Sequence, residues 1–186
     1  MQKIIVFITD LYGTFFANEN MYIRDLETKK LILYLEKIRI FEHADNVFFE
    51  FITLERREVL QFFLREFSLY LINSKIILKN QICKDGIYHF KDDKYIFEER
   101  PLDKLHQIDE EIAYFYHNYD VKAMYYADDA MFYQEKLLDK YSNQINLIMP
   151  SMVENYNSKL ITSEKLALEG VNDCLNKKIK TFIKKI

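Results

Sequence analysis

The first hydrophobic segment of the chain, residues 3–9, carries apolar and β-branched side chains without alternation of polar and apolar positions. A continuous apolar run of this kind is typical of a parallel strand that is buried on both faces. It ends at Asp10, and Gly13 follows three positions later. In an open α/β sheet, ligands bind outside the carboxyl ends of the strands. The pattern predicts a strand that places Asp10 at such an edge, although Asp and Gly are also common in ordinary turns.

The rest of the chain alternates between helical and strand patterns. Apolar residues recur at helical intervals in segments that we predict to be helices, residues 25–42, 55–72, 103–117, 131–142 and 168–182. Short apolar runs between these segments predict strands over residues 46–53, 75–78, 121–126 and 145–149. The segment 82–98 differs, because the dipeptide Asp85-Gly86 lies between short apolar runs, as in a hairpin.

This alternation implies a parallel sheet with helices on both faces. We therefore expect one α/β domain over residues 1–186, a Rossmann-like parallel sheet flanked by helices, with a small β-hairpin excursion near residues 82–98. The length allows a single domain with a sizeable core. With three Gly and two Pro in the whole chain, no segment has the composition of a flexible linker.

Polar residues follow several of the predicted strands at corresponding places. Asp10 follows the first strand, Thr53 ends the second, and the pair Asp128 and Asp129 comes just after the strand 121–126. Parallel strands that share a sheet bring their carboxyl ends to one edge. We therefore expect these four side chains to lie together, with a role in catalysis or metal binding.

Composition narrows the functional classes. The net charge of −3 gives no basic excess that would indicate nucleic-acid binding. Cys83 and Cys174 lack metal-ligand spacing and do not form a disulfide framework, which fits a reducing, cytoplasmic location. No apolar run approaches the roughly 20 residues of a membrane helix, so we expect no membrane association. The apolar start is too short for a signal peptide.

The polar positions resemble the motifs of the haloacid dehalogenase (HAD) superfamily in its capless core form. The first motif is similar to Asp10-Leu11-Tyr12-Gly13-Thr14, and the second, a Ser or Thr at a strand end, to Thr53. The third motif is a Lys, for which Lys104 is the best match, ahead of Lys94 and Lys91. The acidic pair Asp128 and Asp129 resembles the fourth motif. The motifs occur in the family's order and cover nearly the whole chain.

The resemblance implies a chemistry for these residues. Asp10 would be the nucleophile that takes a phosphoryl group as an aspartyl-phosphate. Asp10, Asp128 and Asp129 would hold Mg²⁺, a hard cation that takes oxygen ligands. Thr53 and Lys104 would bind the phosphoryl oxygens. The substrate would be a phosphorylated molecule, and the absence of a large cap would suit a macromolecular one.

Tyr12 departs from the phosphatase pattern, in which a second Asp stands two residues after the nucleophile as general acid and base. Tyrosine, with an ordinary pKa near 10, is a poor base at neutral pH. A Tyr at this position resembles the dehalogenase branch of the family, whose enzymes attack carbon without Mg²⁺. However, the interval between Thr14 and Asn46 holds a single predicted helix, and the helical cap of that branch is missing.

Three functions are consistent with the sequence. The first is a small HAD-like phosphohydrolase or phosphotransferase with an Asp nucleophile and Mg²⁺. The second is a catalytically degenerate HAD-fold protein that binds a ligand or a protein partner as a regulatory module. The third is a dehalogenase-like hydrolase. An unrelated α/β domain, in which Thr53 is an ordinary strand-end residue and Lys104 a solvated helix residue, is the alternative to all three.

Overall fold

The computed structural model describes residues 1–11, 25–91, 94–128, 130–141 and 143–148. Its main sheet contains five parallel strands in the order β3-β2-β1-β7-β8. These strands are β1 (Lys3–Thr9), β2 (Asn46–Phe51), β3 (Ile76–Leu78), β7 (Asp120–Ala127) and β8 (Asn146–Ile148). The predicted parallel sheet is confirmed, and β1 lies at its centre, as its continuous apolar sequence requires.

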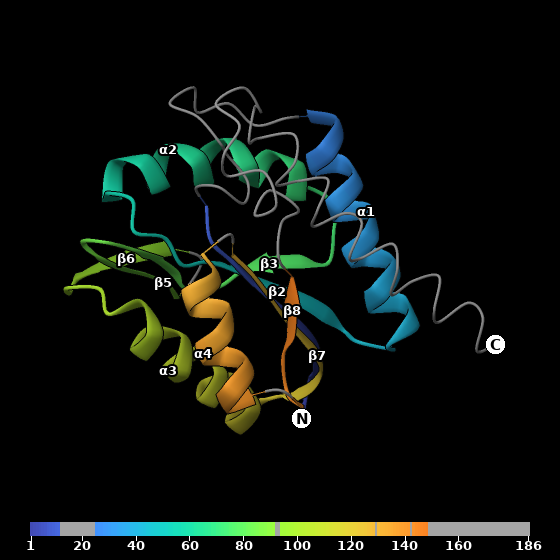
Figure 1. Cartoon of the computed structure of the whole chain (residues 1–186). Coiled ribbons are helices and arrows are strands. Elements are labelled where there is room, and N and C mark those ends of the chain that lie inside the picture. Colours follow the sequence, from blue (N-terminus) through green and yellow to red (C-terminus); the bar gives the residue numbers. More distant parts are fainter. Residues whose placement is uncertain (12–24, 92–93, 129, 142, 149–186) are drawn as a thin grey trace, which may run out of the picture.

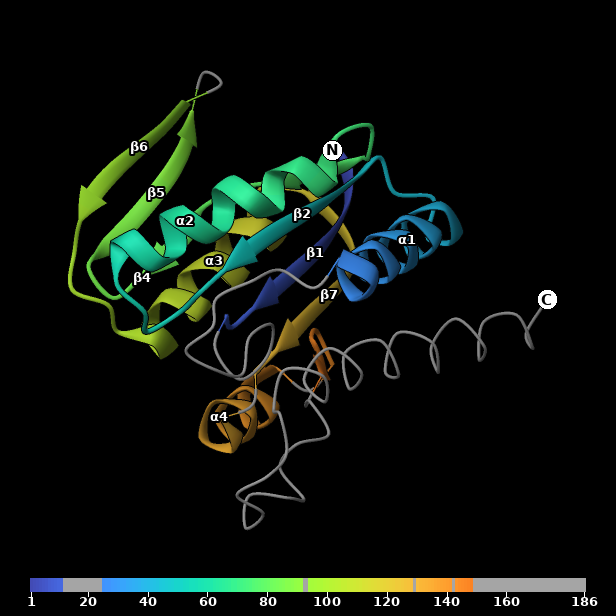
Figure 2. The same ribbon diagram turned by 90° about the horizontal axis from the view of Figure 1, so that it is seen from above.

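Helices cover both faces of this sheet (Figures 1 and 2). On one face α1 (Asp25–Phe41) and α2 (Arg57–Phe67) pack on Phe7, Phe49 and Phe51. On the other face α3 (Lys104–Asn118) and α4 (Met131–Tyr141) pack on residues that alternate with these along the strands, such as Val6 and Phe48. The two cores therefore use opposite sides of the same strands, which follows from the two-residue repeat of a strand.

The predicted boundaries need small corrections. The segment 55–72 is not one α-helix, because α2 ends at Phe67 and a 3₁₀ helix, Ser68–Leu71, follows. The strand predicted over 46–53 ends its regular pairing at Phe51. The expected helix 168–182 and the residues Tyr12 and Asp129 lie outside the described residues.

The hairpin excursion is a three-stranded antiparallel sheet of β4 (Gln81–Cys83), β5 (Gly86–Lys91) and β6 (Lys94–Glu99). Gly86 lies close to β6, where a Cβ atom would be 2.1 Å from the carbonyl oxygen of Glu98. Gln81 joins the two sheets. Its side-chain carbonyl accepts from the Phe51 amide at 2.9 Å and its amide donates to the Phe49 carbonyl at 2.9 Å. This side chain thus satisfies backbone groups of β2 beyond the end of β3.

The order of the strands locates the ligand-binding edge. The chain passes from β1 to β2 and β3 on one side and returns to β7 and β8 on the other. In such sheets the crevice lies at the carboxyl ends of the two strands where the direction of winding changes. Here those strands are β1 and β7. None of the helices in the described part of the chain has the length and apolar character needed to cross a bilayer.

Candidate functional site

Asp10 and Asp128 lie side by side at the carboxyl edge of the main sheet. Strands β1 and β7 pair in parallel, with Thr9 opposite Ala127, so each Asp is the next residue along its strand. The Asp10 amide donates to the Ala127 carbonyl at 2.8 Å, which extends the pairing to the first carboxylate. The juxtaposition expected from the sequence is present, and it comes from strand register rather than from a loop.

Lys104 bridges the two carboxylates. It is the first residue of α3, whose N-cap Asp103 accepts from the His106 amide at 3.1 Å. Its Nζ lies 2.8 Å from Asp10 Oδ1 and 2.8 Å from Asp128 Oδ2. The side chains of Lys104 and Asp128 are 3% and 0% exposed. Of the three candidate lysines for the third motif, Lys104 is the one that contacts Asp10. Lys94 lies at the exposed start of β6, and Lys91 is the last residue of β5.

The charges of this cluster are partly compensated. Burial by itself lowers the pKa of Lys104, but the carboxylates of Asp10 and Asp128 outweigh it, and the net shift of this pKa is upward. Lys104 is therefore a fixed cation at neutral pH. One positive charge faces two carboxylates, which leaves the described cluster with a formal charge of −1.

Tyr126 and Ala130 hold Asp128 in place. The Tyr126 hydroxyl donates to Asp128 Oδ2, and the Ala130 amide donates to Asp128 Oδ1 at 2.7 Å. Burial, followed by the charge of Asp128, raises the pKa of Tyr126 well above its ordinary value, so this phenol stays a donor. Tyr126 was not among the site residues expected from the sequence. Its position two residues before Asp128, on the same face of β7, was the signal for this contact.

Thr53 lies at the same edge but its hydroxyl has a local partner. Strand β2 pairs with β1 up to Phe51, and the Ile52 amide donates to the Thr9 carbonyl at 3.0 Å. Thr53 is buried, and its Oγ1 accepts from the Glu55 amide at 3.2 Å. This bond leaves the hydroxyl proton free to donate to a phosphoryl oxygen. The described hydrogen bonds of Thr53 are with Glu55 in the turn that leads into α2 and, through its amide, with the Ile82 carbonyl of β4 at 3.0 Å.

The carboxylate oxygens at this edge are poorly suited to bridge a Mg²⁺ ion, because they already have other contacts. Both Asp10 Oδ1 and Asp128 Oδ2 already contact the Lys104 ammonium, and Asp128 Oδ1 accepts from an amide. Within the residues that the structure describes, no three carboxylate, imidazole or thiol groups gather as a metal site requires. An ion between Asp10 and Asp128 would have to displace Lys104 from one of its contacts.

A second buried polar cluster lies on the same face of α3, and sequence reasoning missed it. Glu50 of β2 and Glu111 of α3 are 0% and 4% exposed. Glu111 accepts from Gln107 Nε2 at 3.0 Å and from Asn80 Nδ2 at 3.2 Å. Glu50 Oε1 accepts from the Asn80 amide at 3.1 Å, whereas Oε2 has no donor.

A proton on Glu50 resolves that unsatisfied oxygen. Burial, followed by the charge of Glu111, raises the pKa of Glu50 well above its ordinary value. Burial raises the pKa of Glu111 as well, but three contacts with side-chain amide groups favour the charged form of this acid. We therefore expect the pair to hold one proton at neutral pH, with Glu50 as the protonated member.

Comparisons of this chain with protein families, with curated proteins and with solved structures find no match.

Proposed function

We propose that this protein is a HAD-like hydrolase that transfers a phosphoryl group from a phosphorylated substrate to Asp10. The observation that carries the proposal is the buried arrangement of Asp10, Lys104 and Asp128 at the switch point of the sheet. A carboxylate nucleophile needs a fixed position, a nearby cation to offset charge that develops on the phosphoryl oxygens, and an open edge for the substrate. These three residues meet the first two requirements, and the strand ends supply the third.

In the proposed reaction a carboxylate oxygen of Asp10 attacks phosphorus, and the bond between phosphorus and the leaving oxygen breaks. The electron pair of that bond goes to the leaving group, which takes its proton from water. Lys104 orients the carboxylate and offsets charge on the transferred group. Water then attacks phosphorus in the aspartyl-phosphate, which returns the carboxylate and releases phosphate. Asp128 keeps the ammonium in place through its own fixed contacts.

Tyr12 sets the proposed substrate preference. A phosphatase without a second Asp lacks a strong general acid and base, a contribution typically worth about 10²- to 10⁴-fold. The loss falls on proton transfer, not on attack by Asp10. Activated donors with good leaving groups, such as aryl or acyl phosphates, should therefore react, whereas alkyl phosphates should react poorly. The phosphoenzyme should be long-lived, because its hydrolysis needs an activated water.

Mg²⁺ is the cofactor that the family resemblance implies, and its binding is a separate question. Saturating Mg²⁺ raises the melting temperature of a protein that binds it in the folded state. If the carboxylates take the ion, wild type should melt at a higher temperature in millimolar Mg²⁺, and Asp128→Asn should lose that rise. A wild-type melting curve that Mg²⁺ leaves unchanged would remove the ion from the proposal.

A dehalogenase-like attack of Asp10 on carbon is the second candidate function. One specific observation favours it, namely that the Lys104 ammonium lies between the two carboxylates that a metal would otherwise bridge. A reaction at carbon needs no metal, and Tyr12 fits that branch of the family. This candidate predicts an alkyl ester on Asp10, whereas the first predicts an acyl phosphate.

The deciding experiment is covalent labelling with an aryl phosphate, followed by mass spectrometry of the intact protein and its peptides. Wild type should gain one phosphoryl group on Asp10, and Asp10→Asn should gain none. Tyr12→Asp should release phosphate faster and hold less label. Asp109→Asn, which alters a carboxylate bonded to Lys140 and Tyr141, is the matched control and should behave as wild type. Labelling that persists in Asp10→Asn, or no label in any variant, contradicts the proposal and favours a binding role.

A further inference from the structure

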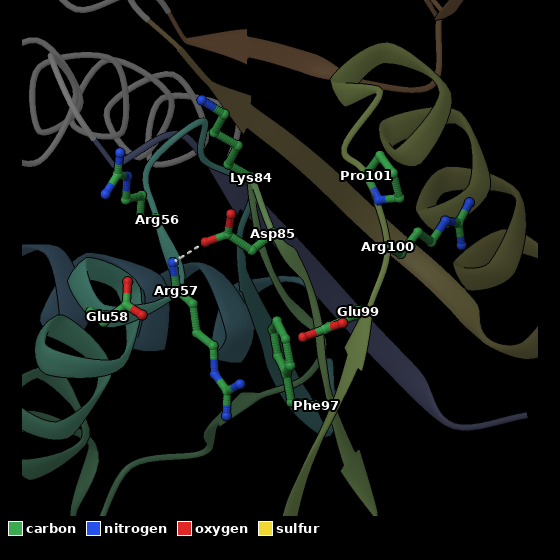
Figure 3. Close-up of a pocket in the computed structure, with 9 residues that line it drawn as sticks. All are labelled: Arg56, Arg57, Glu58, Lys84, Asp85, Phe97, Glu99, Arg100 and Pro101. Atoms are coloured by element: carbon green, nitrogen blue, oxygen red, sulfur yellow. Dashed lines mark hydrogen bonds between the residues drawn. The ribbon is translucent and has the colours of Figure 1, made fainter.

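A large pocket lies beside the carboxyl edge of the main sheet. It has a volume of about 870 Å³ and is lined by charged residues from the start of α2, the turn between β4 and β5, and the end of β6 (Figure 3). Its volume is within the range of small-molecule sites, about 300–1,000 Å³. The apolar contribution to its lining comes from Phe97 and Pro101.

The chain connects this pocket directly to the candidate site. Arg56 lies three residues after Thr53, and Arg100 lies four residues before Lys104. The Lys84 amide donates to the Glu55 carbonyl at 2.9 Å, which ties the β4–β5 turn to the segment that follows Thr53. In Figure 2 the start of α2 and strand β4 lie on the side of the molecule where β1 and β2 end. A substrate with its phosphoryl group at Asp10 can therefore extend toward this pocket.

Three of the charged residues that line the pocket already have partners. Arg57 Nε donates to the Tyr88 hydroxyl at 2.9 Å, and its guanidinium lies 4.0 Å from the centre of the Phe97 ring. Arg100 pairs with Glu110 at 2.8 Å. Asp85 accepts from the Arg57 amide at 2.8 Å. These contacts fix the positions of three charged groups in the walls of the pocket.

Arg56 and Lys84 are different. Both side chains are exposed, and among the described residues neither makes an ion pair or a side-chain hydrogen bond. In Figure 3 the side chains of Arg56 and Lys84 both extend on the side of Asp85 that faces away from Phe97 and Glu99. The two unpaired cations thus form one end of the pocket.

We propose that Arg56 and Lys84 bind a second oxyanion, a carboxylate or a further phosphate, on the part of the substrate that does not react. A guanidinium and an ammonium at the same end of a pocket are suited to such a group, since the first binds two oxygens in a plane and the second adds a point charge. The inference rests on the proposed function for the position of the reacting phosphoryl group. It assigns the substrate to phosphorylated molecules with at least two anionic groups.

The test uses two phosphonates that cannot be hydrolysed, phenylphosphonate and 3-carboxyphenylphosphonate, measured by calorimetry at low salt. Wild type should bind the carboxylated probe about tenfold more tightly, because only this probe carries a second anionic group for the two cations. The double variant Arg56→Gln with Lys84→Gln should bind both probes equally. Lys75→Gln removes an exposed lysine that precedes β3, at the opposite edge of the sheet, and should keep the preference.

The outcomes separate this inference from the proposed function. Equal binding of both probes to wild type, or a preference that survives in the double variant, overturns the second-anion site and leaves the phosphoryl site standing. Failure of both probes to bind overturns both. A preference that follows Arg56 and Lys84, in a protein that is never labelled on Asp10, supports the anion site and overturns the catalytic proposal. Melting curves of the variants check that each is folded.

Discussion

Two buried polar clusters lie along one face of α3. Each contains two acidic side chains close together, and the two clusters compensate this buried charge in different ways. At the start of the helix, Lys104 places an ammonium between Asp10 and Asp128. Two turns later, Glu111 faces Glu50 with amide donors but no ion pair among the described residues. Like charges cannot be buried together without compensation. The first cluster is compensated by a cation, and we expect the second to be compensated by a proton on Glu50.

The difference indicates which cluster is suited to chemistry. The ammonium leaves Asp10 and Asp128 as carboxylates at the sheet edge, where a nucleophile is useful. A proton on Glu50 would leave the second pair with a single charge, and Asn80 donates to both acids at the interface of β2 and α3. We therefore interpret the first cluster as functional and the second as structural. The predictions below test this contrast.

The largest effect is expected from Lys104→Met, which leaves two carboxylates buried without their cation. Breaking a buried ion pair from one side costs about 3–5 kcal/mol in the free energy of unfolding. The measurement is urea unfolding in the presence of a metal chelator. Lys140→Met breaks the exposed pair with Asp109 and should lower the free energy of unfolding much less, because solvent screens an exposed pair. Equal losses in the two variants would contradict the role given to Lys104.

The Lys104→Met variant also tests whether Asp10 and Asp128 can bind Mg²⁺. With the ammonium gone, the two carboxylates are open to another cation. Millimolar Mg²⁺ should then restore part of the lost stability of Lys104→Met, by an amount that grows with the concentration of the ion. No recovery would mean that the geometry of this edge accepts an ammonium but not a metal.

Glu50→Gln should have the next largest effect, and its sign depends on pH. The folded-state pKa of Glu50 is raised above its ordinary value of 4.5, so above pH 4.5 the folded state binds more protons than the unfolded state. Stability is therefore full at low pH and falls as pH rises toward the folded-state pKa. Gln mimics the protonated acid, since its amide can donate to Glu111 permanently.

We expect Glu50→Gln to reduce the loss of stability between pH 5 and 8, and to be more stable than wild type by about 1–3 kcal/mol where Glu50 ionises. Thermal unfolding across that pH range measures the effect. Glu66→Gln, at an exposed position of α2, is the control and should keep the wild-type pH profile. An unchanged profile in Glu50→Gln would show that Glu50 is not the protonated member of the pair.

The smallest effect is expected from Tyr126→Phe, which removes one of the donors to Asp128. Asp128 keeps its contacts with Lys104 and with the Ala130 amide, so the cost should be about 1–2 kcal/mol. Loss of labelling on Asp10 should be partial, because Tyr126 positions Asp128 rather than the nucleophile. Tyr141→Phe removes a similar phenol contact with Asp109 and should leave labelling unchanged. Complete loss of labelling in Tyr126→Phe alone would assign Tyr126 a direct role.

The sequence by itself determined the elements of this fold and the two strand ends that carry the candidate carboxylates. The uninterrupted apolar run before Asp10 and the apolar strand before Asp128 could be read directly, because local periodicity reflects the side of each element that is buried. The small antiparallel sheet was visible in the Asp85-Gly86 turn. The boundaries were less certain, as at the 3₁₀ helix after α2, where the apolar pattern continues although the helix type changes.

Only the tertiary structure decided which polar residues meet and in what charge state. The register of β1 and β7 places Asp10 beside Asp128. The position of α3 places Lys104, one of three candidate lysines, in contact with both carboxylates. In the sequence Glu50 is one polar residue within a strand, and nothing near it marks a shared proton. The charge of a buried group depends on partners that are distant in sequence, as Glu111 is from Glu50, and on the water that packing excludes. Local sequence patterns give no information on distant partners or on excluded water. The sequence therefore predicts the fold but not the electrostatics of the site.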